Sequence, residues 1–123
     1  MSQDLISDAL NQIMNAKRAR KDSLVLKRHS KLLLKVLDIV KDAGYIDYQI
    51  KNKELIIQII KLNEFKAIKP RYTVTVNRID YYKRRFLPAK NFGFIIISTN
   101  NGLMKHDEAE EKNIGGCLVA YVF

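Results

Sequence analysis

An apolar run that stops at a polar turn, near the C-terminal end, constrains the fold more than any other feature. Residues 92–97 are aromatic, glycine and isoleucine, and a short apolar run bounded by turn residues is typical of a buried strand. Residues 98–102 follow as Ser-Thr-Asn-Asn-Gly, where glycine allows the positive φ of a tight turn. Gly115 and Gly116 then precede a closing strand over residues 117–123. The strand therefore ends in hydroxyl and carboxamide groups, and the glycines allow another backbone to approach closely. This pattern predicts a recognition surface and not a nucleophile site.

Composition bounds the size and the surroundings of the protein. A chain of 123 residues is long enough for one domain or two small lobes, and its hydrophobic fraction of 47% is enough for a core. No apolar run approaches the ~20 residues of a membrane span, and the early acidic residues Asp4 and Asp8 do not fit a secretory signal. The single cysteine, Cys117, fits a reducing compartment. We therefore expect a cytoplasmic protein.

The positive charge is concentrated in two segments. Residues 17–35 hold eight basic residues and one acidic residue, and residues 66–90 have the same content, so each segment carries +7. Because the whole chain carries +9, the remainder carries −5. Two basic segments on an otherwise acidic chain predict a polyanion partner that is contacted at two places. A solvated basic surface that keeps the protein soluble is the alternative explanation.

Apolar periodicity predicts an α/β (α+β) fold of two small lobes, each a short mixed or antiparallel sheet with helices packed on it. The first lobe spans residues 1–62. Its predicted elements are a helix over 3–19, a strand over 23–27, a helix capped by Ser30 and ended by Gly44, and a hairpin with strands over 45–50 and 55–60.

The second lobe spans residues 63–123. Its predicted elements are a strand over 72–76, a short helix that Asn77 caps and Pro88 stops, the strand over 92–97, a helix over 105–112 and the closing strand. Ile79, Tyr82 and Phe86 share one helix face and are expected in the core, whereas Tyr72 and Tyr121 are the better contact candidates. Alternation along the closing strand predicts that Cys117 and Tyr121 lie on the same face.

No motif for catalysis or metal binding accompanies these elements. Ser98, His106 and Asp107 lack the G-x-S-x-G elbow and the spacing of a nucleophilic triad, although a small hydrolase centred on Ser98 and His106 is one alternative. His29, His106 and Cys117 lack metal-ligand spacing, and the acidic residues of 107–111 fit the positive end of a helix dipole. We expect no enzymatic activity, no metal and no cofactor.

The sequence also resembles a known family. The run FGFIIISTNNGLMKHDEAEEKNIGGCLVAYVF, residues 92–123, is similar to the C-terminal signature of the small-subunit ribosomal protein eight family. The resemblance covers the whole chain. It extends upstream through Asp4, Asn15-Ala16, Ser30-Lys31 and residues 42–46, and it is closest to archaeal members at Lys69-Pro70-Arg71-Tyr72, Leu87-Pro88-Ala89 and His106.

The resemblance implies two α/β lobes, no enzymatic activity and direct binding of small-subunit rRNA, in its central domain at an irregular helix, early in subunit assembly. Ser98 and Thr99 match the family's contact loop, and Asn100 stands where many members have serine. Lys105 replaces the usual Ser or Thr cap of the acidic helix, and Cys117 replaces a glutamate of bacterial members. Together with the basic segments, the predicted RNA-binding residues are Ser98, Thr99, Asn100, Asn101, Gly102, Gly115, Gly116, Tyr121, Lys69, Arg71, Tyr72, Lys83, Arg84 and Arg85.

The predicted function is therefore that of an rRNA-binding structural protein of the small ribosomal subunit. Its expected partners are small-subunit rRNA and neighbouring ribosomal proteins, with no membrane and no small-molecule substrate. The alternative within RNA binding is a translational regulator that binds an mRNA stem imitating the rRNA site.

Overall fold

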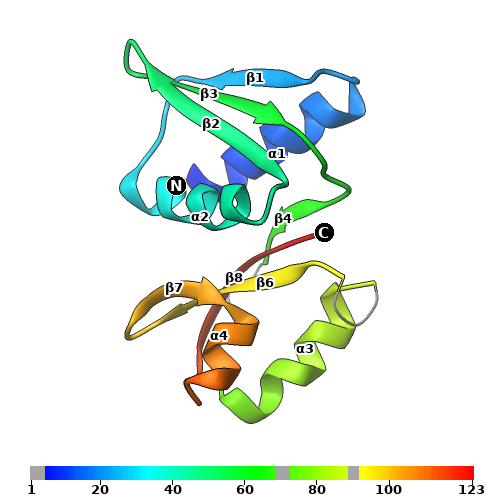
Figure 1. Cartoon of the computed structure of the whole chain (residues 1–123), viewed down its shortest axis with the longest axis vertical. Helices are drawn as coiled ribbons and strands as arrows, with labels where there is room; N and C mark the ends of the chain where they lie inside the picture. Colours follow the sequence, from blue (N-terminus) through cyan, green and yellow to red (C-terminus); the bar gives the residue numbers. More distant parts are fainter. Residues whose placement is uncertain (1–4, 69–72, 89–91) are drawn as a thin grey trace. The chain divides into compact units, whose positions relative to one another are not determined.

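A computed structural model describes residues 5–68, 73–88 and 92–123, and these divide into two compact units (Figure 1). The units are Met1–Phe65 and Lys66–Phe123. Helices and antiparallel sheets make up both units, so the predicted α+β fold class is confirmed. Within the described residues, no helix combines the length and the apolar character needed to span a membrane.

The N-terminal unit is a three-stranded antiparallel sheet covered by two helices. Its sheet has the order β1-β3-β2, so the strongly apolar β3 is central. Leu55 and Ile57 of β3 are fully buried while Gln58 is exposed, because successive residues of a strand face opposite sides. Helix α1 packs against β1 and α2, and α2 packs against β2. The elements are α1 (Leu5–Arg18), β1 (Ser23–Leu26), α2 (Lys31–Asp42), β2 (Ile46–Lys51) and β3 (Glu54–Ile59).

Local signals set the ends of these elements. The Ser30 side chain accepts a hydrogen bond from the Leu33 N–H at 3.2 Å, which satisfies a donor that the first turn of α2 would leave unpaired. Gly44 follows α2 with a φ of +88°, a conformation that glycine adopts without strain. The hairpin turn was expected over residues 51–53, but Lys51 belongs to β2. Asn52 and Lys53 both have positive φ values and form a two-residue turn between β2 and β3.

The C-terminal unit is a sheet with the strand order β4-β8-β6-β7, and β5 also pairs with β8. Strands β4 and β7 were not predicted, because segments of three and four residues are too short to show a hydrophobic period. Asn77 lies inside a 3₁₀ turn instead of capping α3, so that prediction is wrong. The elements are β4 (Phe65–Ala67), β5 (Thr73–Val74), the 3₁₀ turn η1 (Val76–Arg78), α3 (Ile79–Phe86), β6 (Phe94–Thr99), β7 (Gly102–Lys105), α4 (His106–Glu111) and β8 (Gly116–Val122).

Helices α3 and α4 belong to a single apolar core with this sheet. Burial of these side chains removes apolar surface from water, which is the main favourable term in folding. The cluster includes residues of both helices and of the central strands, and Tyr82 and Phe86 pack at its margin as their spacing predicts. The buried members are Ile68, Val74, Ile79, Leu87, Ile95, Ile97, Met104, Ala109 and Leu118.

A bulge in β8 changes which side chains share a face. Ile95 pairs with Tyr121, but Ser98 pairs with Cys117, so Val119 is an extra residue between the two pairs. Paired residues lie on the same face, and Ile95 and Ser98 lie on opposite faces because they are three positions apart along β6. Cys117 and Tyr121 therefore lie on opposite faces, and the alternation predicted for this strand is wrong.

Candidate nucleic-acid interface

The β6–β7 hairpin presents the polar sequence of residues 98–102 at its tip. Thr99 pairs with Gly102, which leaves Asn100 and Asn101 as the two turn residues, both exposed. The φ of Gly102 is +105°, and a β-carbon there would meet no atom within 4 Å. Glycine is needed at this position for its backbone conformation. Ser98 and Thr99 belong to the end of β6, so the strand extends two residues beyond its predicted end.

The hydroxyl of Thr99 stabilises the turn from within. Its Oγ1 donates to the Gly102 carbonyl at 2.9 Å and accepts from the Asn101 N–H at 3.1 Å. A hydroxyl has one proton to donate, and that proton is engaged here. Thr99 therefore shapes the tip and offers a partner at most one remaining lone pair.

Ser98, Asn100 and Asn101 differ from Thr99 in this respect. Across the described ranges, no intramolecular hydrogen bond or ion pair engages their side chains. Asn100 and Asn101 are exposed and Ser98 is half-buried. A carboxamide offers two donors and two acceptor lone pairs, so these residues bring uncommitted hydrogen-bonding groups to one end of the sheet.

Gly115, just before β8, and Gly116, the first residue of β8, are packed against the protein's own backbone. A β-carbon on Gly115 would lie 2.4 Å from the Val74 carbonyl oxygen, and one on Gly116 would lie 2.3 Å from the Ser98 carbonyl oxygen. Both distances are far below van der Waals contact. The close backbone approach predicted for this pair is therefore made by β5 and β6, and the glycines hold β8 against the strand that carries Ser98.

The basic residues of α3 fall into two kinds. The Lys83 ammonium lies 3.4 Å from Glu110 of α4 and 3.6 Å from Asp80, and only 24% of its side chain is exposed. Arg84 is 77% exposed, although it pairs with Asp80 at 3.0 Å, and Arg85 is exposed with its guanidinium 5.4 Å from the centre of the Phe86 ring. Lys83 links two helices, whereas the arginines face solvent.

Tyr121 lies in a row of aromatic rings. Its ring stacks on Phe86 at a centroid distance of 5.3 Å and on Phe123 at 6.1 Å, and Phe86 stacks on Tyr82. Such aromatic pairs stabilise a fold by more than the burial of their apolar surface alone would do. Sequence reasoning missed a more exposed ring, Tyr81, which is 48% exposed with the Arg78 guanidinium 4.8 Å above it. Their three-residue helical spacing is the signal that could have found this pair.

The remaining predicted residues are not all in one place. Lys69, Arg71 and Tyr72 lie outside the described residues. Within the C-terminal unit, the tip of the β6–β7 hairpin and helix α3 lie on different sides of α4 (Figure 1). The unit thus has a polar hairpin tip and a separate basic helix.

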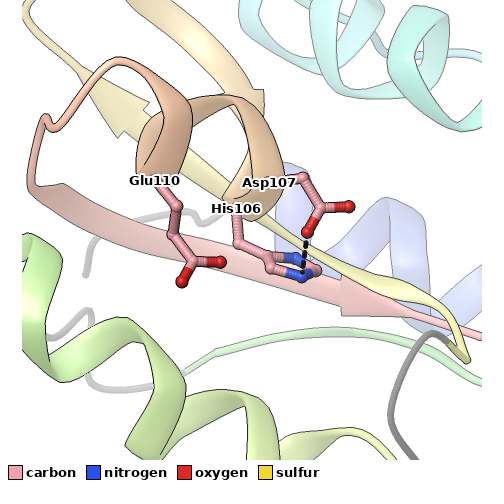
Figure 2. Close-up of side chains that lie close together, drawn as sticks. All are labelled: His106, Asp107 and Glu110. Atoms are coloured by element: carbon pink, nitrogen blue, oxygen red, sulfur yellow. Dashed lines mark ion pairs between the residues drawn. The ribbon is translucent and has the colours of Figure 1, made fainter.

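Three side chains of α4 form a cluster of titratable groups. Potential ligand atoms of His106, Asp107 and Glu110 all lie within 4.8 Å of one another (Figure 2). Both ring nitrogens of His106 are engaged, by the Ile95 N–H and by Asp107, and Glu110 already pairs with Lys83. A cation would have to displace these partners, and His106 has no free nitrogen with which to act as a base toward Ser98.

Comparison with known proteins assigns the chain to a family. A sequence model described as ribosomal protein S8 matches residues 4–123. The chain belongs to the ribosomal protein S8 family. The small ribosomal subunit protein uS8 of Nanoarchaeum equitans is 38% identical over all of both chains. That of Methanococcoides burtonii is 40% identical over 98% of this chain and 97% of its own.

Membership of the S8 family confirms the resemblance drawn from the sequence, including its archaeal character, since both relatives are archaeal proteins. It makes the chain a small-subunit ribosomal protein with a structural role in translation. The lysine at position 105, where the family usually has Ser or Thr, also has a visible effect on helix α4. Lys105 precedes α4 as its N-cap residue and makes no side-chain capping hydrogen bond, as its side-chain chemistry predicts.

Proposed function

We propose that the protein binds small-subunit rRNA directly, at an irregular helix of the central domain, and supports early assembly of the subunit. The observation that carries this proposal is the tip of the β6–β7 hairpin, where Ser98, Asn100 and Asn101 hold uncommitted polar groups beside a hydroxyl that shapes the turn. A structural protein of the ribosome acts in the cytoplasm among RNA and neighbouring ribosomal proteins, and no catalytic step is needed for this role.

The chemistry of RNA helices favours recognition by a polar hairpin tip of this kind. A-form RNA has a deep, narrow major groove, so proteins recognise it through minor-groove edges, 2′-hydroxyls, phosphates and irregular shape. Short Ser and Asn side chains both donate and accept, which suits 2′-hydroxyls and base edges alike. The glycine pair supports this geometry indirectly, because close packing of β8 keeps the Ser98 end of β6 in place.

Cations supply the part of the affinity that does not depend on sequence. Arg84 and Arg85 are exposed on α3, and the N-terminal unit adds the exposed residues Arg18, Lys27 and Arg28 from its own basic segment. Phosphate contacts of this kind fix the register of a protein on RNA without reading bases. We propose that both basic segments meet the same RNA.

An mRNA stem that imitates the rRNA site would meet the same tip. Sedimentation separates the two cases: co-migration with small subunits is expected for the ribosomal role. A protein that is bound to mRNA and absent from small subunits would contradict it.

Single substitutions of the α3 cations are expected to have different salt dependences. Removing one cation that neutralises a phosphate should flatten the slope of log affinity against log salt by about 0.7–0.9. We expect this for Arg84→Ala and for Arg85→Ala, and a smaller change for Lys83→Ala, whose ammonium is already paired with two carboxylates. Binding titrations over several salt concentrations measure the slopes. Unchanged slopes for both arginine variants would show that α3 is a solvated face.

A further inference from the structure

His106 occupies an unusual position for a histidine. Of all the residues that the structure describes, it is the only polar or charged one that is buried, with 4% of its surface exposed. It is the first residue of α4 and follows directly after β7. Its Nδ1 accepts a hydrogen bond from the Ile95 N–H of β6 at 3.0 Å, and its Nε2 lies 3.0 Å from the Asp107 carboxylate (Figure 2).

The ring continues the β6–β7 ladder where the strand itself stops. The register pairs Ile97 with Met104 and Ile96 with Lys105, so the next pair would be Ile95 with His106. At that point the chain turns into α4 and the backbone carbonyl is no longer available to Ile95. The Nδ1 of His106 takes the place of that carbonyl. A buried backbone N–H without an acceptor would be costly, so the ring closes the base of the hairpin.

Only one protonation state of the ring can do this. Nδ1 accepts from Ile95 and must therefore be unprotonated, while the proton on Nε2 is donated to Asp107. A second proton on Nδ1 would place two donors against each other at 3.0 Å. The ring would then have to leave the Ile95 N–H, and the base of the hairpin would open.

We propose that neutral His106 is a positioning residue for the RNA-contact hairpin, and that its protonation in mild acid releases the hairpin and weakens RNA binding. The RNA-binding part of this inference rests on the function proposed above. The hairpin tip lies only three residues beyond Ile95, at Ser98, so an opening at the base acts on the segment that carries the contact groups.

The charged surroundings of the ring act in both directions. Burial lowers the pKa of His106 from its ordinary value of 6.5, and Lys83 of α3 lowers it further, whereas Asp107 and Glu110 of α4 raise it. The net shift is downward. A histidine whose folded pKa lies below its unfolded pKa stabilises the fold fully above about pH 6.5, and that contribution is lost as the pH falls below this value.

Binding of a small-subunit central-domain RNA fragment, measured from pH 7.5 to pH 5, tests the proposal on the full chain. Wild-type affinity is expected to fall as the pH is lowered over this range, by at most about tenfold for each pH unit, because one proton is linked to the release. In His106→Asn the carboxamide oxygen replaces Nδ1 as acceptor and does not titrate, so its profile is expected to be flatter. The matched control is His29→Gln, which removes the other histidine and should keep the wild-type profile.

If the RNA affinities of the wild type and of His106→Asn fall equally as the pH is lowered, the proposal is wrong. It is also wrong if the affinity of the wild type does not change with pH. RNA binding at pH 7.5 that does not change with pH would contradict this inference and leave the proposed function standing. Absence of RNA binding at both pH 7.5 and pH 5 would contradict the proposed function.

A second measurement needs neither RNA nor a folded variant. Hydrogen exchange of the Ile95 amide, corrected for its intrinsic pH dependence, reports whether its hydrogen bond persists. Protection is expected to fall in step with the NMR titration of the His106 ring. Protection that is maintained after the ring has titrated would contradict the proposal.

Discussion

Replacing Gly116 with alanine is expected to destabilise the C-terminal unit by about 3 kcal/mol, at the upper end of the costs of overpacking. The added methyl group would lie 2.3 Å from the Ser98 carbonyl oxygen and 2.9 Å from a side-chain carbon of Ile97. The first of these is backbone, so a rotamer change cannot relieve the clash. Strand β8 would have to move away from β6. Urea denaturation measures the change in the free energy of unfolding.

Gly102→Ala is the matched control in the same unit. Its φ of +105° makes the substitution strained, but a β-carbon there meets nothing within 4 Å. We expect it to cost about 1–2 kcal/mol, which is the penalty of a left-handed conformation without a steric clash. Gly116→Ala with wild-type stability would show that the glycine is not required for strand packing.

Ser98→Ala and Asn101→Ala are each expected to weaken binding to the irregular rRNA helix by about 1–3 kcal/mol, the cost of leaving a buried polar partner unsatisfied. This corresponds to roughly 5- to 150-fold in affinity. Fluorescence binding titrations at fixed salt measure it. The loss should be smaller on a regular duplex of equal length, because a regular duplex lacks the shape that the tip is proposed to fit.

Asn11→Ala is the control for these variants, since Asn11 is an exposed residue of α1 in the other unit. It should bind like the wild type on both RNAs. Equal losses on the irregular and the regular RNA for the tip variants would indicate general weakening, and circular dichroism would show whether unfolding is its cause.

The fold could be predicted wherever a short stretch of chain carries its own signal. Ser30 caps α2 with its own side chain, Gly44 follows it with a positive φ, and β3, which has four apolar residues among its six, is the central strand. The features that sequence analysis missed carry no signal of their own, because the segments are short or because pairing with another strand defines them. Strand β7 is defined by its pairing with β6, and the face of Cys117 depends on a bulge that no local pattern shows.

The candidate site, too, could be predicted only in part. The position of the polar turn was clear from residues 98–102, but the sequence does not show which of its groups are already used. Thr99 bonds the turn itself, and Lys83 bonds Glu110, which is 27 residues away. The first interaction depends on the exact geometry of the turn and the second on a tertiary contact. The sequence therefore does not show which polar side chains are already bonded within the protein and which are left for a partner.

The central claim is that the tip of the β6–β7 hairpin recognises RNA. Hydroxyl-radical footprinting of small-subunit rRNA tests it most directly, with the wild type and the Ser98→Ala/Asn101→Ala double variant compared at saturating protein. We predict that the wild type protects one irregular helix of the central domain and that the double variant loses that protection while remaining folded. Identical footprints from the two proteins, or wild-type protection confined to regular duplex, would contradict the claim.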